Sequence, residues 1–440
     1  MERKFFAVTP LVHRAGTVGR VTIKPRFAHA ADILRKITRL AGFRADGTCR
    51  DGVTIAGYAA FESLEFRLEA DGALVFDYPF ATESEYFFRL YQKSGDQEIP
   101  VLEFNAYALE PDWFDLRPFK GDFHIHTNRS DGLETPDYVA AAGRAIGLDF
   151  CAITDHRQYQ PSLDAIASQS AFQTAYRCYP GEEVHALDNP VHIVNFGGDA
   201  SVNRMFQEDE AGYRQEVAER AAALPGSLPE MVRFQTAASE WVFDRIRSAG
   251  GLALYCHPYW RPHGRYYIAD AVNEAILARR NFDLLEVYGG HHRHETESNA
   301  LSLARYQELR AAGARVAPAG VSDAHGCDRG ELFGWFYTLV LARSAAFADL
   351  KTAMLRGDCL AVEALPGEFP HLAGDFRLIR YAYFLLREFY PEHNRLCREE
   401  GEAMQEFLAG DETARERAAG AARRLERYCG EVWSREHETR

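Results

Sequence analysis

The chain has 440 residues, and its hydrophobic content of 47% and charged content of 26% are typical of a globular protein with two or three domains. A net charge of −14 argues against a general nucleic-acid or membrane-surface binder, because such proteins usually carry a basic face. The eight cysteines form no C-x-x-C pair, and no run of about 18 apolar residues could span a bilayer. We therefore expect a cytoplasmic protein.

The first 118 residues are predicted to be mostly β-structure. Apolar and polar residues alternate in "LEFRLEADGALVFDYPF", "EYFFRLYQ" and "VLEFNAYAL", which is the pattern of half-buried strands. One segment, "AADILRKITRLAGF", predicts a helix instead. We predict a β-sandwich domain over residues 1–118, ending in the proline-containing linker "EPDWFDLRPFKGD".

Strands and helices are predicted to alternate over residues 119–364. The segment "TPDYVAAAGRAIGL" predicts a helix with Thr135 as its N-cap and Pro136 at its first position. Such alternation favours an α/β fold with a parallel sheet or barrel. The predicted strands are "FHIHT", "DFCAITDH", "VHIVNFG", "GLALYCHP", "DLLEVYG" and "RVAPAGVSD".

Residues 365–440 are predicted to form a helical C-terminal extension. The apolar residues of "DFRLIRYAYFLLREFY" cover more than one narrow stripe, which predicts a helix buried on more than one side. We expect this helix to pack on the barrel or on a second subunit. A homo-oligomer formed through the C-terminal helices therefore stays open.

Residues that commonly bind metals stand at the ends of the predicted strands. His124 and His126 are two positions apart, and strand side chains at that spacing point to the same side, so both imidazoles can reach one ion. In α/β barrels the reacting groups gather at the C-terminal ends of the strands. A mixture of imidazole and carboxylate ligands suits zinc, manganese or iron better than calcium or magnesium. The other candidate ligands are Asp131, His156, Glu183, His192, His257, Asp323 and His325.

The order of these motifs resembles that of the PHP superfamily, which is named for polymerase and histidinol phosphatase domains. The resemblance spans roughly residues 119–345. It implies a distorted (β/α)7 barrel with up to three metal ions. A β-sandwich before such a barrel is similar to the branch of the superfamily that cleaves carbamates and aryl esters. The matching motifs are "HIHT", "SDG", "GLDFCAITDH", "PGEEVH", "VHIVNFG", "CHP" and "VSDAHG".

The resemblance also implies how the candidate ligands divide among three metal ions. Glu183 is shared between the first two ions, and Glu183, Asp323 and His257 are the residues expected to be catalytic. The implied sets are His124, His126, Glu183 and Asp323 for the first ion, Glu183, His192 and His257 for the second, and Asp131, His156 and His325 for the third.

The predicted reaction is metal-dependent hydrolysis of a small phosphomonoester or nucleotide. Two or three divalent ions can hold a bridging hydroxide beside the substrate, because metal binding lowers the pKa of water to about 7. The substrate is then a small anionic molecule. Arg157, Arg261 and Arg265 follow ligand-bearing strands and are predicted to hold phosphate oxygens.

An ester or carbamate hydrolase using the same metal centre is the main alternative. Its pocket would be aromatic, built from residues such as Tyr159, Tyr259 and Trp260, whereas several arginines would favour phosphate. The segment "CHPYWRPHGRYY" contains both kinds of residue, so the sequence leaves the choice open.

Three further functions are weighed against the sequence. A non-catalytic, metal-stabilised binding module fits poorly, because degenerate PHP domains usually lose ligands. Proofreading of nucleic acid fits poorly with the net charge of −14. A classical amidohydrolase barrel would need a bridging lysine, and none occurs between Lys120 and Lys351.

Two neighbouring features are predicted to lie outside the metal centre. Glu182 stands next to Glu183, and a shift of register by one residue would exchange the two. The run "GGHHRHE" holds His291, His292 and His294, and it is expected to form a solvated loop over the mouth of the barrel, with contact to the substrate as the alternative.

Overall fold

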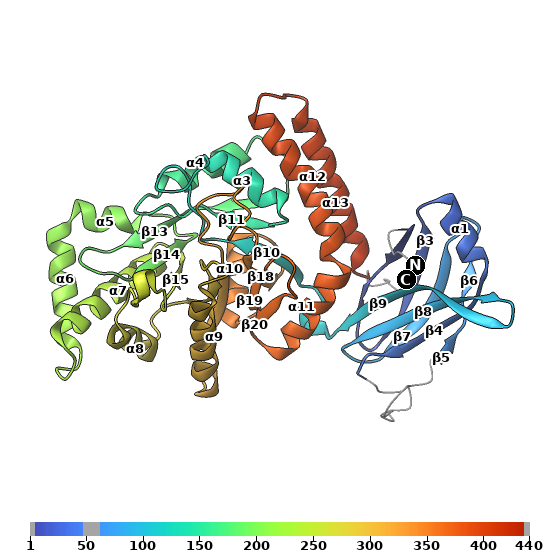
Figure 1. The fold of residues 1–440 in the computed structure, drawn as a ribbon, viewed down its shortest axis with the longest axis horizontal. Helices are drawn as coiled ribbons and strands as arrows, with labels where there is room; N and C mark the ends of the chain where they lie inside the picture. The colour runs from blue at the N-terminus through green and yellow to red at the C-terminus, as the bar shows by residue number, and fades with distance from the viewer. Residues whose placement is uncertain (1–4, 47–61, 435–440) are drawn as a thin grey trace. The chain divides into compact units, whose positions relative to one another are not determined.

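The computed structural model of this protein describes residues 5–46 and 62–434 (Figure 1). This part of the chain is mixed α/β, with 13 α-helices and four sheets, which confirms the α/β class. The division at residues 118 and 364 stays a prediction. Backbone contacts group the chain into two compact units: unit 1 is Met1–Leu116, Arg380–His393 and Arg423–Arg440, and unit 2 is Arg117–Ile379 and Asn394–Ala422.

Unit 1 contains two sheets whose neighbouring strands are antiparallel except for the β2–β9 pair. The first has the order β1 (Phe6–Thr9), β3 (Thr17–Pro25), β7 (Leu74–Phe80), β6 (Arg67–Leu68). The second has the order β2 (Val12–Arg14), β9 (Gln97–Leu109), β8 (Ser84–Ser94), β4 (Ile37–Arg44), β5 (Glu62–Leu64).

Aromatic side chains join the two sheets of unit 1. The ring of Phe76 on β7 lies 5.1 Å from that of Phe88 on β8 and 6.4 Å from that of Phe104 on β9. All three side chains are buried. The expected helix in "AADILRKITRLAGF" is only half right: α1 (Ala28–Arg35) ends early, and the rest forms β4, because its residues pair with β8.

The first sheet of unit 2 is mixed. Strands β12, β11 and β10 are parallel to one another, whereas β18, β19 and β20 continue the sheet antiparallel. The segment expected to be a linker contributes α2 (Pro111–Phe114) in unit 1 and all of β10 here. The strand order is β12 (Arg177–Tyr179), β11 (Phe150–Ala152), β10 (Arg117–Asp122), β18 (Phe336–Ala342), β19 (Cys359–Glu363), β20 (His371–Ala373).

The second sheet of unit 2 supplies most of the candidate ligands. Its first two pairings are antiparallel and its last two are parallel, so the parallel sheet predicted from the sequence is wrong for β13 and β14. A short connection between β13 and β14 makes an antiparallel hairpin there instead of a helical crossover. The order is β13 (Gly181–His185), β14 (His192–Phe196), β15 (Leu252–Tyr255), β16 (Leu284–Gly289), β17 (Ala317–Val321).

The two sheets of unit 2 share one apolar core and are joined by isolated backbone bridges. The bridges pair Ile125 with Ala324 and His156 with Glu183, next to the candidate ligands. The core includes Phe150 from the first sheet and Phe196 from the second, both fully buried. The strands therefore surround a single interior, with the candidate ligands at one end of it.

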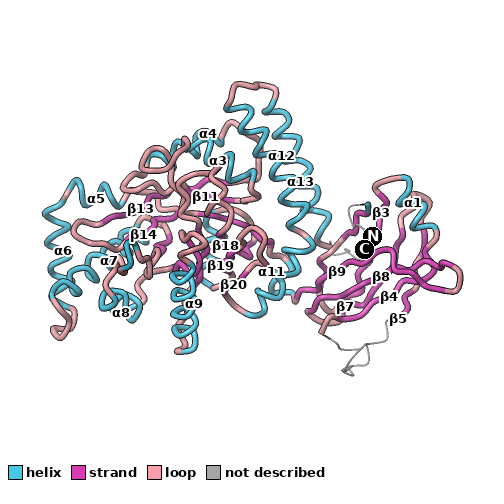
Figure 2. Tube along the Cα trace, viewed as in Figure 1, coloured by secondary structure: helices cyan, strands magenta, loops and turns pink. Residues whose placement is uncertain are grey.

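Helices lie around the strands of unit 2 (Figure 2). Helix α7 packs on β14 and β15, α9 on β16, and α10 on β18. No helix in the described part of the chain is long and apolar enough to cross a membrane. The helices of this region are α3 (Pro136–Ala145), α4 (Gln160–Gln169), α5 (Val202–Glu208), α6 (Glu210–Ala223), α7 (Glu230–Ser248), α8 (Asp270–Arg279), α9 (Thr296–Ala311) and α10 (Phe347–Arg356).

Three C-terminal helices follow, and the two units share their residues. They are α11 (Phe376–Glu388), α12 (Tyr390–Leu408) and α13 (Ala414–Val432). In unit 1, the rings of Tyr381 and Phe384 lie 5.0 and 5.3 Å from the ring of Tyr107. In unit 2, Arg144 of α3 donates a 2.8 Å hydrogen bond to Glu400 of α12, with both side chains buried.

Candidate metal centre

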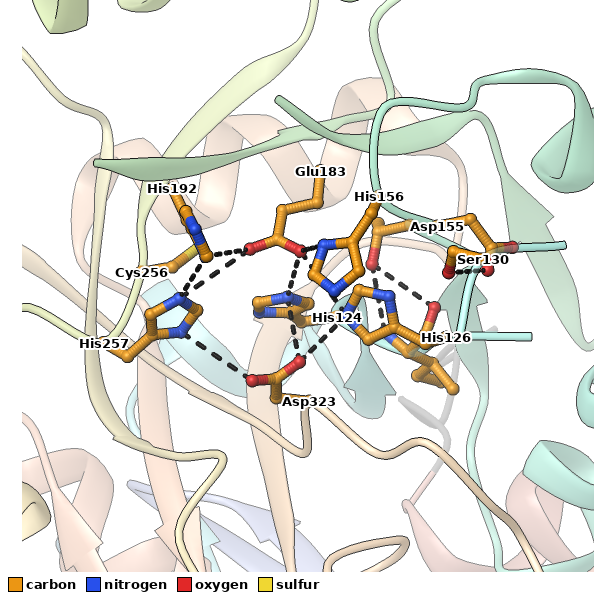
Figure 3. Close-up of polar contacts among 12 residues, drawn as sticks. His124, His126, Ser130, Asp155, His156, Glu183, His192, Cys256, His257 and Asp323 are labelled. Atoms are coloured by element: carbon orange, nitrogen blue, oxygen red, sulfur yellow. Dashed lines mark hydrogen bonds and ion pairs between the residues drawn. The ribbon is translucent and has the colours of Figure 1, made fainter. Parts of the chain in front are cut away.

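The sequence predicted that His124 and His126 lie within a strand. In the structure they follow the end of β10 at Asp122. Their segment is held beside the residues that follow β17. The backbone N–H of Asp323 donates to the carbonyl of His124 at 2.8 Å, and that of His126 donates to the carbonyl of Ala324 at 2.9 Å. These contacts bring the two imidazoles and the Asp323 carboxylate to one place (Figure 3).

A buried carboxylate fastens the same two segments together. Asp122 accepts hydrogen bonds from the backbone N–H of His124 at 3.3 Å and of Ser322 at 3.1 Å.

Two candidate ligands have positive φ angles, +48° at Asp323 and +27° at His257. Such a backbone costs about 1–3 kcal/mol at a residue other than glycine, and it is found mostly at functional sites.

The first group of candidate ligands surrounds Asp323 Oδ1 and Glu183 Oε2. Asp323 Oδ1 lies 3.2 Å from His124 Nε2 and 2.9 Å from His126 Nε2. Glu183 Oε2 lies 3.6 Å from each of the same two nitrogens. The structure thus brings together the four residues expected to hold the first ion.

The second group surrounds the other oxygen of Glu183. Its Oε1 lies 2.9 Å from His192 Nδ1 and 3.7 Å from His257 Nε2. The two imidazole nitrogens lie 3.0 Å apart. The Glu183 carboxylate therefore stands between two groups of imidazoles, with one oxygen toward each.

The third group is more open to solvent. Asp131 Oδ2 lies 3.4 Å from His156 Nε2, and Asp131 Oδ1 lies 3.3 Å from His325 Nε2. His325 Nδ1 lies 2.8 Å from the carbonyl oxygen of Asp323, to which it can donate, and this leaves Nε2 as the nitrogen on the side of Asp131. His126 borders this group as well, through its Nδ1.

The polar atoms of these groups suit bound cations. Both nitrogens of His124, both oxygens of Glu183 and one nitrogen each of His126 and His257 are buried without a hydrogen-bond partner among the described residues. A buried polar group left unpaired costs about 1–3 kcal/mol, and more if it is charged. Four of these atoms, Nε2 of His124, Nδ1 of His126 and both oxygens of Glu183, face the ligand groups and are explained if divalent cations pair with them.

The ionised carboxylates of the site also favour bound cations. Burial opposes ionisation of Glu183, but His192 and His124 outweigh it and hold the pKa of this carboxyl well below its usual value. Burial also opposes ionisation of Asp323, yet His124 and His126 lower its pKa well below the usual value. Two carboxylates thus keep their negative charge inside the protein, which attracts positive charge to the site.

Residues next to the ligands hold the loops in place. Asp155 accepts hydrogen bonds from the Thr127 backbone N–H at 2.8 Å and from Ser130 Oγ at 2.6 Å, which orders the loop that carries Asp131. Glu182 faces away from the centre and accepts hydrogen bonds from Ser201 Oγ at 2.7 Å and the backbone of Val202 at 2.5 Å. Glu183, and not Glu182, is therefore the carboxylate that reaches the imidazoles.

A cavity of about 450 Å³ opens onto the ligand groups. His291 lines it and is buried, so the expectation that this histidine lies in a solvated loop is wrong. The fold brings its segment, which follows β16, over the centre. Besides the ligands, the cavity is lined by His185, Trp260, Tyr267, Gly290, His291, His292, Glu295 and Leu332.

The three arginines expected to hold phosphate are absent from the described residues that line this cavity. Arg157 lines a separate cavity of about 620 Å³. Arg261 is exposed and forms an ion pair with Glu297 at 3.1 Å. Arg265 follows a one-turn helix, Pro262–Gly264, and does not line the cavity at the ligand groups.

Glu286 is a candidate site residue that sequence reasoning missed. It lies on β16, is 2% exposed and stands beside His124 and His257. Burial opposes its ionisation, but the two imidazoles outweigh burial and lower its pKa to about 2. The sequence feature that could have indicated this residue is a carboxylate within the apolar segment "DLLEVYG", because a buried charge needs a partner.

The similarity of this chain to known proteins is low. No family model and no curated protein matches the chain. A two-domain protein from Bacteroides vulgatus, described as containing a predicted PHP-like metal-dependent phosphoesterase, is 18% identical over 57% of this chain and 66% of its own, with a TM-score of 0.34. A protein from Bifidobacterium adolescentis, provisionally described as a metal-dependent phosphoesterase, is 22% identical over 48% of this chain and 88% of its own, with a TM-score of 0.32. An amidohydrolase from Chromobacterium violaceum with bound sulfate is 20% identical over 47% of this chain and 87% of its own, with a TM-score of 0.30.

Proposed function

We propose that this protein is a metal-dependent phosphoesterase that hydrolyses a small phosphomonoester or nucleotide at a centre of two or three divalent cations. The position of Glu183 carries the proposal. Its Oε1 faces His192 and its Oε2 faces His124, so one buried carboxylate stands between two groups of imidazoles. On this proposal unit 2 is a PHP-type (β/α)7 barrel, and the cations are zinc, manganese or iron.

When bound, divalent cations supply Lewis-acid chemistry: they polarise a substrate oxygen, lower the pKa of water toward about 7 and offset the charge of a phosphate. The chain supplies a matched set of donors for them. Glu183 and Asp323 remain charged. Burial lowers the pKa of His192 to about 4 despite the opposing effect of Glu183, so its imidazole is neutral and keeps a free lone pair.

The proposed substrate is small and anionic. A cavity of about 450 Å³ admits a small molecule. The third ligand group, at Asp131, His156 and His325, is the most exposed and lies where the cavity meets the centre. A cation held there would add positive charge beside the first two, which favours a dianionic phosphate over a neutral ester.

Hydrolysis of a neutral aryl ester or carbamate is the second candidate. The observation that favours it is the wall of the cavity, where Trp260 and Tyr267 lie with ring centroids 5.0 Å apart. No arginine or lysine joins them among the described lining residues. An aromatic wall without cationic side chains suits a planar, uncharged group.

A matched pair of substrates tests the proposal. The metal-loaded protein is assayed with 4-nitrophenyl phosphate and with 4-nitrophenyl acetate, which release the same leaving group, and kcat/KM is compared. We expect metal-dependent hydrolysis with the phosphate preferred. A preference for the acetate would move the assignment to the ester and carbamate branch, and metal-independent turnover of both would contradict the proposed centre.

A further inference from the structure

Glu286 occupies a position that the proposed reaction does not use directly. It lies within β16, and its Oε2 is buried without a hydrogen-bond partner among the described residues. The nearest imidazole nitrogens are His257 Nδ1 at 3.6 Å and His124 Nδ1 at 3.9 Å. Both histidines belong to the proposed metal centre, one to each of the first two ligand groups.

We propose that Glu286 is a positioning residue that fixes the tautomers of His124 and His257 by accepting the Nδ1–H of both rings. The proposal rests on the metal centre proposed above. With the proton held at Nδ1, each ring has its lone pair at Nε2. These Nε2 atoms face Glu183, at 3.6 Å for His124 and 3.7 Å for His257, where cations would be bound.

The carboxylate of Glu286 is a buried charge. A carboxylate oxygen without a partner inside a protein costs several kcal/mol, so Oε2 of Glu286 requires a donor. The two Nδ1 atoms are within 4 Å of it. An imidazole that ligates through one nitrogen usually donates its other N–H to a carboxylate or carbonyl, which fixes its orientation and raises its basicity.

Cys256 is the competing group, because it lies beside Glu286 and both histidines. Its Sγ lies 3.5 Å from the carbonyl oxygen of Leu254, to which the thiol can donate. Cys256 is therefore assigned to packing, and the carboxylate of Glu286 is the acceptor for the two rings.

Zinc affinity provides the first test. The full-length protein is stripped of metal and titrated with Zn²⁺ against a chromophoric chelator, as wild type and as Glu286→Gln, Glu286→Leu and Cys256→Ala. Glu363→Gln is the matched control, because Glu363 is a buried carboxylate of the same unit that bonds to Asn299 and His371 instead of a ligand. Glu286→Leu should weaken zinc binding about 10–100-fold, and Glu286→Gln less, since its amide oxygen can still accept one N–H. Glu363→Gln and Cys256→Ala should bind as the wild type does.

Imidazole NMR of the zinc-loaded wild type provides a second test, whose main readout needs no variant. Long-range ¹H–¹⁵N spectra should show Nδ1–H tautomers for His124 and His257, and both signals should change in Glu286→Gln. Nε2–H tautomers in the wild type, or wild-type zinc affinity in Glu286→Leu, would overturn the positioning role alone. A loss of zinc in Cys256→Ala equal to that in Glu286→Leu would overturn it in favour of a Cys–His–Glu metal site. A wild type that binds no zinc would refute the proposed centre itself.

Discussion

Replacing Glu183 by glutamine removes the charge between the two ligand groups while keeping the size of the side chain. Loss of a partner outside the ligand shell costs about 10–100-fold in metal affinity. On the proposed function Glu183 is a ligand of two cations, and imidazole nitrogens lie 2.9 Å from one of its oxygens and 3.6 Å from the other. We therefore expect at least about a 100-fold loss of affinity and a fall in activity of several orders of magnitude.

Because metal binds the folded state, the loss of metal affinity should also lower the metal-induced rise in Tm. At a metal concentration of about 1,000 Kd, binding stabilises the wild type by about 4.1 kcal/mol, and a 100-fold loss of affinity leaves about 1.4 kcal/mol. The difference of about 2.7 kcal/mol should reduce the metal-induced rise in Tm by about 5–10 °C, at about 2–4 °C per kcal/mol. The assay is thermal unfolding with and without metal, together with circular dichroism of the metal-free proteins.

Glu182→Gln is the matched control for this experiment. Glu182 is the adjacent buried carboxylate, but it faces Ser201 and Asn203 on the other side of β13. Its replacement should lower the stability of the metal-free protein without reducing the metal-induced shift. The reasoning is refuted if Glu183→Gln keeps near-native turnover and the full shift, or if Glu182→Gln loses them instead.

Three other predictions concern separate parts of the molecule. Burial lowers the pKa of His13 from 6.5 to about 3, although a backbone contact with Pro10 opposes the shift. Below pH 6.5 the unfolded state therefore binds more protons than the folded state, and the stability falls as the pH falls. Unfolding of the wild type and of His13→Phe at pH 7 and pH 5 should show the wild type losing about 2 kcal/mol more, and equal losses would contradict this. Arg261→Ala should change kcat/KM for 4-nitrophenyl phosphate less than twofold, because Arg261 pairs with Glu297; a loss of about 1.5–3 kcal/mol would instead establish the phosphate contact expected from the sequence. Trp260→Ala should raise KM for an aryl phosphate by about twofold to tenfold and leave KM for an alkyl phosphate unchanged, whereas equal effects on both would rule out stacking.

Part of the candidate metal centre follows from local spacing in the sequence. His124 and His126 share a side because they are two positions apart in extended backbone, and Asp323 and His325 repeat that spacing in the segment beside them. Helix α3 begins at Pro136 after the N-cap Thr135, as predicted. Local rules of this kind can be applied to one segment at a time.

Other features depend on contacts between distant segments, which one sequence does not reveal. Glu286 is 162 positions from His124 along the chain, and only the packing of β16 beside β15 and β17 brings it to the centre. The sequence did not predict that β14 runs antiparallel to its neighbours, because side chains alternate in the same way in parallel and antiparallel strands. The helix predicted to be buried on more than one side begins with an exposed residue, Phe376, because an apolar pattern does not say which face meets a neighbour.

The most direct test of the central claim is the number of divalent cations bound per chain. Elemental analysis by mass spectrometry, on protein reconstituted with zinc or manganese and freed of excess metal, should give two or three ions per chain. Glu183→Gln prepared in parallel should hold fewer. A wild type that retains less than one ion per chain, with its fold intact by circular dichroism, would contradict the proposed centre.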